Sequence, residues 1–338
     1  MIKCSFIRST ARFSPFNVPL ISRTSPWTSS IRSELRIVDP ILTTYARGYK
    51  NAALVCDTLF PLVGVDKEAG KLPQFGKEAF RIYQTLRALR AKSNRINPDS
   101  YGHIDVVLEE HDLEYPIDYR ERQEASQVLP LERWGTNVVT QGIRLRCEKQ
   151  CADLAQDVNS YPPGNKIVLA GTAKFSDKVN SDPIGVIEDG KDAVRQRIGT
   201  NPNTGVIGYE AWKKMKQHPQ FIDRIKYSMK GVLTVDLLKE IIEVDNIIIG
   251  AAVFDNEAGG AFTDLWQDNI ILAYVPKTAN DAERSEYEPS FGYTFRKKDH
   301  PLVDTRVEDG KVQIIRNTDI FKPYIVGGEA GYLIKGTN

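Results

Sequence analysis

The stretch that decides the fold covers residues 57–119 and reads DTLFPLVGVDKEAGKLPQFGKEAFRIYQTLRALRAKSNRINPDSYGHIDVVLEEHDLEYPIDY. It opens on an apolar, β-branched segment at residues 59–65, makes a Gly- and Lys-rich excursion, and returns through a second apolar segment at residues 104–108. This pattern predicts two strands joined by a long excursion. Because a two-stranded excursion is only marginally stable alone, the sequence predicts an arm that needs another surface to lie on.

The charges of this arm are sorted along the chain, and between residues 77 and 95 only Glu78 is acidic. The basic residues of the excursion are Lys77, Arg81, Arg87, Arg90, Lys92 and Arg95. The acidic residues of the return and of the segment after it are Asp105, Glu109, Glu110, Asp112, Glu114, Asp118, Glu121 and Glu124. Since the net charge of the whole chain is only +1, the simplest partner for such an arm is another copy of the same protein. The pattern therefore favours assembly over catalysis.

Length and composition bound the class of protein. A chain of 338 residues has room for about two domains of typical size. It is 41% apolar and 26% charged, which favours a packed core over wholesale disorder. Near-neutral charge argues against a dedicated nucleic-acid binder, although it permits a basic inner face on an assembled particle. The four cysteines (Cys4, Cys56, Cys147, Cys151) indicate no disulfide framework, and no apolar run approaches the ~18 residues that span a bilayer.

The first 33 residues have the composition of an organelle transit peptide. They hold five basic residues, many Ser and Thr, and no acid before Glu34. A flexible basic arm and translated sequence upstream of the true start are the alternatives, because three prolines interrupt any amphipathic helix there. We expect residues 1–38 to be a disordered or mis-started extension and keep them out of the fold argument.

Beyond the arm, the sequence predicts one long helix. Pro116 is expected to close the returning strand. Pro130 suits the first turn of a helix, and the apolar residues that follow it repeat with a period of 3.6 residues. A helix over residues 131–158 would be about 40 Å long. Gly135 and Gly142 inside it indicate close packing or a bend.

The second half of the chain alternates helix and strand before it becomes β-rich. Helices are expected at residues 186–198, 210–217 and 235–244, and strands at residues 205–208 and 246–253. Further strands are expected at residues 269–275, 293–296, 311–316 and 320–325. This order predicts a compact α/β subdomain followed by strands.

No strong catalytic signature is present in the sequence. The chain lacks a phosphate loop, a glycine-rich dinucleotide loop, a nucleophile elbow and an H-E-x-x-H zinc motif. Tyr209 and Lys213 match the Y-x-x-x-K spacing of hydride-transfer enzymes, but without a dinucleotide loop a surface pair on a helix is the better interpretation. Cys147 and Cys151 share a helix face. Because a zinc site needs more ligands than two, we interpret them as small packing residues and expect no catalytic, cofactor or metal site.

Two further patterns have a functional and a plain interpretation. His103, Asp105, Glu109 and His111 share one face of an extended strand, where either a divalent cation or a salt-bridged interface would fit, and the interface is favoured. The segment 210–230 is basic and would either touch DNA phosphates or form a solvated helix face, which is favoured. Its basic residues are Lys213, Lys214, Lys216, Arg224, Lys226 and Lys230.

Several short stretches carry a resemblance to a known family. They are DPIL (39–42), ARGY (46–49), LFP (59–61), GKLPQFGKE (70–78), HDLEYPID (111–118), SDPI (181–184), RIKYS (224–228) and LAYVP (272–276). In this order they resemble the major capsid proteins of tailed bacteriophages, which have the Hong Kong 97-type fold. The likeness runs from about residue 39 to the last residue, and none of the stretches is a mechanistic motif.

The resemblance implies an α+β fold with five parts. These are an N-terminal arm (39–65), an extended β-hairpin loop (66–110), a peripheral domain with a long spine helix (111–181), an α/β axial domain (182–269) and C-terminal strands that return to the peripheral domain (270–338). The loop would lie across a neighbouring subunit, and the axial domain would surround the five- and sixfold axes. The chain has no room for the scaffolding region with which some members begin, so a separate scaffold is implied if one is needed.

The function implied by the resemblance is that of a shell subunit. Pentamers and hexamers of the chain would form an icosahedral phage head around double-stranded DNA, in the host cytoplasm, with scaffold, portal and decoration proteins as further partners and with no cofactor and no membrane. On this interpretation Arg87, Arg90, Lys92 and Arg95 contact acids of the segment 109–124 on adjacent copies. The alternatives are an encapsulin-type nanocompartment shell, an enzyme with an unrecognised site in the α/β region, and a mitochondrial protein.

Overall fold

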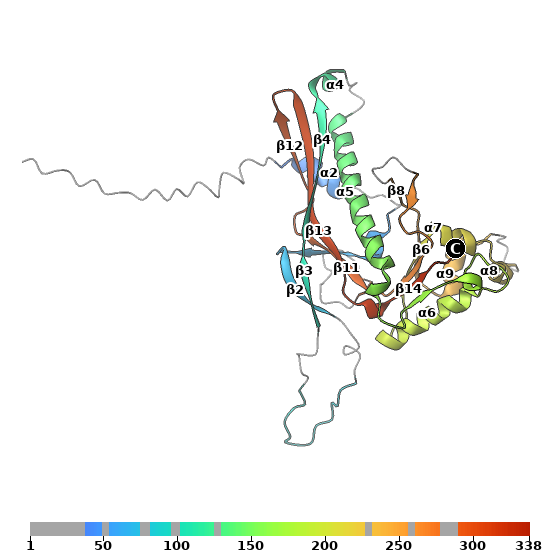
Figure 1. Ribbon diagram of the computed structural model, residues 1–338. Coiled ribbons are helices and arrows are strands. Elements are labelled where there is room, and N and C mark those ends of the chain that lie inside the picture. Colours follow the sequence, from blue (N-terminus) through green and yellow to red (C-terminus); the bar gives the residue numbers. More distant parts are fainter. Residues whose placement is uncertain are drawn as a thin grey trace, which may run out of the picture. The chain divides into compact units, whose positions relative to one another are not determined.

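One long helix, α5 (Leu131–Gln156), packs along two antiparallel strands, β4 (Glu109–Asp118) and β13 (Val312–Ile325) (Figure 1). The computed structural model describes residues 38–48, 54–74, 82–95, 102–124, 130–226, 232–255, 261–277 and 290–338. The 26 residues of α5 make a helix about 39 Å long, which confirms the predicted long helix.

Two glycines let α5 approach the sheet closely. A Cβ atom at Gly135 would lie 2.8 Å from the ring of Tyr115, and a Cβ atom at Gly142 would lie 2.7 Å from Cδ2 of Leu113. Both contacted side chains belong to β4. The predicted role of these glycines in close packing is therefore confirmed.

The strands beside α5 form a five-stranded sheet, in which β4 is an edge strand. The order is β1 (Leu62–Val65), β11 (Gly292–Lys297), β13 and β12 (Leu302–Glu308), with β4 also paired to β13. The prediction that Pro116 closes the returning strand is wrong, because β4 continues to Asp118. Within the described residues β4 pairs with β13 alone. Proline is tolerated on such an edge strand, since its missing N–H group can face away from the ladder.

The sequence pattern divided β13 into two predicted strands, whereas the structure has one. Polar residues between its apolar halves caused the error, and each has a partner inside the protein. Asn317 donates from Nδ2 to Oγ1 of Thr140 on α5 at 3.0 Å. Asp319 forms an ion pair with Arg296 on β11 at 3.1 Å. Because each of these buried side chains has a partner on a neighbouring element, the strand runs through them. Strand β12 was not predicted.

A second five-stranded sheet carries the α/β part of the chain. Its order is β5 (Lys166–Val168), β14 (Gly331–Lys335), β10 (Ile270–Ala273), β6 (Thr204–Gly208) and β7 (Asn246–Gly250). Strands β6 and β7 are parallel. The expected strands in this part are confirmed, although the one predicted at residues 246–253 ends at Gly250, and β5 and β14 were not predicted. Since β10 and β14 pair within this sheet, it extends across the expected boundary at residues 269/270.

Four helices accompany this sheet, and their ends follow capping rules. They are α6 (Pro183–Ile198), α7 (Tyr209–Met215), α8 (Pro219–Ile225) and α9 (Val235–Ile242). Helix α6 packs on β10 and β14, and α9 packs on β7. At α6 the carboxylate of Asp182 accepts from the backbone N–H of Gly185 at 3.0 Å, and Gly199 ends the helix with φ 72°. Helix α8 was not predicted, because His218-Pro219 was interpreted only as a stop.

The predicted arm is a hairpin of β2 (Ala69–Gln74) and β3 (Gly102–Val107) with antiparallel register. The remaining short elements are α2 (Pro40–Gly48), α3 (Cys56–Leu59), α4 (Tyr119–Glu124), β8 (Val253–Phe254), β9 (Thr263–Asp264) and the 3-10 turns η3 (Val158–Ser160), η4 (Gly171–Ala173) and η6 (Gly328–Ala330). Apart from Val38, the expected N-terminal extension lies outside the described residues. No helix of the described part is both long and apolar enough to cross a bilayer.

The main apolar core joins α3, the second half of α5 and the α/β sheet. It contains Phe60 after α3, Cys147 and Cys151 on α5, and the buried faces of β6, β10 and β14. A smaller cluster beside β11 holds Val63, Val106 and Leu108, so the base of the hairpin arm is packed against the first sheet. The arm therefore starts from a fixed platform.

Candidate functional site

The base of the arm is fixed by hydrogen bonds and ion pairs as well as by packing. The hydroxyl of Tyr324 on β13 accepts from the backbone N–H of Val107 at 3.0 Å and donates to its carbonyl at 2.9 Å. Lys298 pairs with Asp66 at 2.8 Å, and Lys297 pairs with Glu68. These contacts hold both strands of the hairpin to the edge of the first sheet, so they set the direction in which the arm leaves the body.

The described part of the excursion, residues 82–95, is exposed at every position. Three large apolar side chains stand in water: Ile82 is 98% exposed, Leu86 86% and Leu89 91%. The segment forms hydrogen bonds within itself. Nδ2 of Asn94 donates to the carbonyl of Leu86 at 3.3 Å, and Arg87 donates to the carbonyl of Ala91 at 2.7 Å. The apolar side chains of this span find no cover within their own described chain.

The basic residues expected at an interface lie on the same span. Arg87, Arg90, Lys92 and Arg95 are all exposed. Arg90 has a φ of 65°, so it sits in the left-handed region at the turn of the excursion. Lys77 and Arg81 lie outside the described residues. Within the described chain, no ion pair joins these four basic residues to the acids of residues 109–124.

The acids of β4 and α4 that were named for the interface divide into two with an ion-pair partner in the subunit and four without one among the described residues. Glu109 pairs with Lys322 at 2.5 Å, which lowers the pKa of Glu109 below its ordinary value. Glu114 accepts two hydrogen bonds from Arg306, at 2.8 and 3.0 Å. The other acids named for the interface, Glu110, Asp112, Glu121 and Glu124, are exposed. Two of the expected contact residues thus already have a cationic partner on β12 or β13, whereas the other four form no ion pair within the described residues.

The structure separates the residues of the candidate cation site. His103 and Asp105 belong to β3, whereas Glu109 and His111 belong to β4. The two strands are separate because the chain pairs with β2 before Leu108 and with β13 after it. His111 stacks on the ring of Phe321 with a centroid distance of 4.5 Å. Burial lowers the pKa of His111, which lies in the field of Glu109, Arg146 and Asp319. Among the described residues these four side chains do not form a group close enough to share one ion.

The Y-x-x-x-K pair and the basic segment lie on helix surfaces. Tyr209 is 47% exposed at the start of α7, and Lys213 pairs with Glu210 at 3.7 Å. Lys216 lies over the ring of Trp212 with its Nζ 4.8 Å from the centroid. Arg224 and Lys226 are exposed, and Lys230 lies outside the described residues. These contacts match the interpretation of a solvated helix face.

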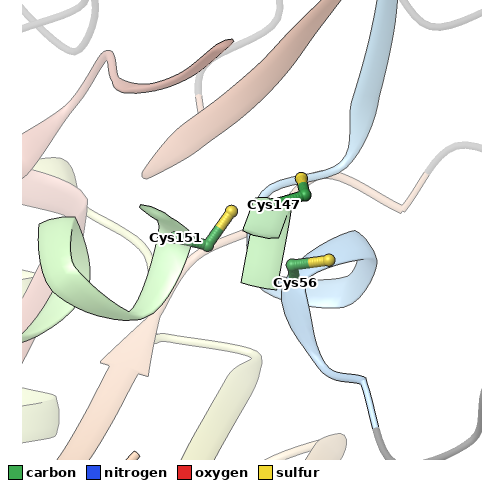
Figure 2. A group of neighbouring side chains, drawn as sticks. All are labelled: Cys56, Cys147 and Cys151. Carbon is green, nitrogen blue, oxygen red and sulfur yellow. The ribbon is translucent and has the colours of Figure 1, made fainter. Parts of the chain in front are cut away.

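A cluster of three thiols was missed by the sequence reasoning. Cys147 and Cys151 share a face of α5 as expected, and α3 brings Cys56 to them, so that the three Sγ atoms lie within 4.8 Å of one another (Figure 2). None of the three side chains is more than 1% exposed. Cys56 precedes the other two by about ninety residues, a separation at which sequence spacing carries no signal.

Glu148, also on α5, fixes the position of Cys56. Its carboxylate accepts from the backbone N–H of Val55 at 3.0 Å, from that of Cys56 at 2.8 Å and from Nε1 of Trp266 at 2.7 Å. Burial raises the pKa of Glu148 to about 8. Within the cluster, hydrogen bonds with Cys151 and Cys56 lower the pKa of the Cys147 thiol to about 5. The cluster is therefore a defined group rather than three separate packing residues.

The fold and these surfaces can be compared with known proteins. A model of the phage major capsid protein E family matches residues 60–338. The chain belongs to this family. A major capsid protein of Burkholderia phage BcepMu is 58% identical over 306 residues, which cover 90% of this chain and 98% of the relative. The expected resemblance to phage major capsid proteins is confirmed.

Solved structures agree with the family assignment. The crystal structure of a phage-related protein from Bordetella bronchiseptica RB50 matches with a TM-score of 0.77 and 34% identity, over 89% of this chain and 98% of that one. The capsid structure of the Cyanophage P-SCSP1u matches with a TM-score of 0.54 and 9% identity, over 86% and 90% of the two chains. At that identity the second match shows the fold alone. The α+β capsid fold of the Hong Kong 97 type is confirmed, and the family is a structural one rather than a class of enzymes.

Proposed function

We propose that many copies of this phage major capsid protein assemble, as pentamers and hexamers, into an icosahedral head that encloses double-stranded DNA. The observation that carries the proposal is the exposed span 82–95, where Ile82, Leu86 and Leu89 are each at least 86% exposed. Side chains of this size on a segment anchored at its base are typical of a surface that is covered in the assembled state. A second copy is the simplest cover, because a shell repeats one contact set in every subunit.

The parts of the subunit have distinct roles in this proposal. The hairpin arm, residues 66–110, lies across a neighbouring subunit. Helix α5 is the spine of the peripheral domain, and the α/β part, expected at residues 182–269, surrounds the five- and sixfold axes. The platform at the base of the arm supports this arrangement, since an arm that spans two subunits must leave its own body in a fixed direction.

Charge is proposed to set the register between copies. Arg87, Arg90, Lys92 and Arg95 of one copy meet the acids of residues 109–124 on the next, and the proposal includes Lys77 and Arg81 among the contact residues. Glu110, Asp112, Glu121 and Glu124 suit this role best, because Glu109 and Glu114 already pair within the subunit. Complementary charge contributes orientation and specificity, and apolar burial contributes most of the affinity.

Other components of the particle follow from the same proposal. A separate scaffold, a portal and decoration proteins are the expected partners, assembly takes place in the host cytoplasm, and the subunit becomes part of the virion. The basic surface of α7 and α8 is a candidate for non-specific contact with packaged DNA, since cations bind phosphates independently of sequence.

Electron microscopy of particles formed by the full chain tests the proposal. The chain is expressed alone and together with the products of neighbouring genes, and the particles are examined by negative staining. We expect closed shells or regular pentamers and hexamers, and nuclease-protected DNA inside shells taken from a phage-producing host. A monodisperse monomer under all of these conditions would overturn the proposal, and protein cargo in place of DNA would favour a nanocompartment instead.

A further inference from the structure

The cysteine cluster lies where three segments of the subunit meet. Cys56 is the first residue of α3, which leads directly into β1 and the hairpin arm, and Cys147 and Cys151 stand one turn apart on α5. All three belong to the main core. Cys151 also approaches the first sheet, since its Sγ is 3.9 Å from Oγ1 of Thr294 on β11. A bond among these groups would join the root of the arm to the long helix.

We propose that Cys56, Cys147 and Cys151 bind one thiophilic cation, Zn²⁺ or Cu⁺, that fastens α3 to α5. Thiolates are the preferred ligands of both ions. No fourth His, Cys, Asp or Glu of the described residues belongs to the group. Three sulfurs alone suit Cu⁺, whereas Zn²⁺ would need an additional ligand. Two oxygens lie near the cluster: Oδ1 of Asp57 is 3.6 Å from Sγ of Cys56, and Oγ1 of Thr294 is 3.9 Å from Sγ of Cys151.

The separation of the sulfurs is close to what a metal requires. With metal–sulfur bonds of about 2.3 Å, sulfur atoms around one ion lie about 3.8 Å apart in a tetrahedral site and about 4.0 Å apart in a trigonal one. The three Sγ atoms already lie within 4.8 Å of one another. A shift of less than about 1 Å, which small rotations about the Cα–Cβ bonds provide, would close the site.

The surroundings support three sulfur ligands. Glu148 is not one of the ligands, but it accepts a hydrogen bond from the backbone N–H of Cys56 and so holds this ligand in position. Hydrogen bonds around other metal sites orient the ligands in the same way. Because none of the three thiols is more than 1% exposed, the ion would enter during folding and its binding energy would add to stability.

Refolding the full chain with metal tests the proposal. Reduced chain is unfolded in the presence of a chelator and refolded without oxygen against Zn²⁺, Cu⁺ or Cd²⁺, and the bound metal is measured by elemental analysis. We expect one ion for each folded chain, with Cd²⁺ giving the ultraviolet charge-transfer band of a thiolate complex. Separate titrations with Zn²⁺ and Cu⁺ in competition with a chelator decide which ion is held more tightly. Folded wild-type chain that takes up none of the three ions would overturn the proposal, whatever the variants do.

Single substitutions locate the ion. Cys147→Ser and Cys151→Ser should each lose the charge-transfer band, and Cys56→Ser should lose it as well. Cys4→Ser is the matched control, because Cys4 is the remaining cysteine of the sequence and is not one of the three ligands. It should keep the full band. Equal metal content in Cys4→Ser and in a folded Cys147→Ser variant would place the ion elsewhere and contradict the assignment.

Discussion

The exposed leucines of the arm allow a prediction that separates assembly from folding. Replacing Leu86 and Leu89 together by serine removes two apolar side chains that are 86% and 91% exposed in the isolated subunit. Each contributes about 1.5–3 kcal/mol when it is fully buried. If a neighbouring copy covers both, the double variant loses about 3–6 kcal/mol per arm, and about half of that if the cover is partial.

Because each subunit carries one arm, this loss of free energy applies once to every subunit that joins a shell. Every 1.4 kcal/mol changes an equilibrium constant about tenfold. The subunit concentration at which shells first form should therefore rise roughly tenfold to a hundredfold for partial cover, and by more for complete cover. Light scattering and sedimentation over a dilution series measure this threshold, and electron microscopy identifies the product.

The free energy of unfolding supplies the internal control. Because both leucines are exposed before assembly, their replacement should change the urea unfolding of the isolated subunit by no more than about 0.5 kcal/mol. Gln84→Ser serves as a matched variant, since Gln84 is an exposed polar residue of the same span, and its threshold should stay near that of the wild type. Shells of Leu86→Ser/Leu89→Ser that form at the wild-type threshold would refute the proposed burial of the arm.

The other predictions concern the arm charges, the packing of α5 and the response to acid. Arg90→Glu combined with Arg95→Glu should impair shell formation while the subunit stays folded and soluble; shells in wild-type yield by electron microscopy would contradict the proposed charge pairing. Gly135→Ala should be less stable to urea than Gly142→Ala by about 1–3 kcal/mol, although both gain about 1 kcal/mol of helix propensity. The reason is that the methyl group added at Gly135 meets the ring of Tyr115 and buried Ile315, whereas the one added at Gly142 meets Leu113, which is 40% exposed. Equal urea midpoints for the two variants would show that the contacted side chains move aside at both positions. Burial lowers the pKa of His111 in the folded chain, so the unfolded chain protonates this residue at a higher pH than the folded chain does. The free energy of unfolding should therefore decrease as the pH falls below about 6.5. His111→Gln should flatten this part of the stability–pH curve, and an unchanged slope in urea titrations would assign the effect to other groups.

Local sequence patterns predicted the elements whose apolar residues are regular. Helix α5 was predictable because its stripe continues through Cys147 and Cys151 with a period of 3.6 residues. The arm was predictable because its two apolar segments flank a polar excursion. The pattern failed on β13, where buried Asn317 and Asp319 look like a turn until their partners on α5 and β11 are known. Tertiary hydrogen bonds, which no local window contains, decided that strand.

The candidate sites depended on long-range pairing to different degrees. The sequence indicated which charges cluster on the arm and on β4, but it did not show that Glu109 and Glu114 pair with Lys322 and Arg306 across the first sheet. The thiol cluster could not be predicted, because Cys56 is brought to α5 by the bonds of Glu148 to the α3 backbone. Spacing along a chain reports on one element at a time, and a site built from two elements stays hidden.

The place of β14 in the second sheet has a consequence for synthesis on the ribosome. Among the described residues, β5 has β14 as its strand partner, although β14 (Gly331–Lys335) follows β5 (Lys166–Val168) by about 160 residues. At about 5–20 residues per second, β5 waits roughly 10–30 s for its partner to emerge. The nascent chain therefore cannot complete this sheet until β14 has been synthesised, and an incomplete subunit is not ready to join a shell. Translation itself would time the release of competent building blocks.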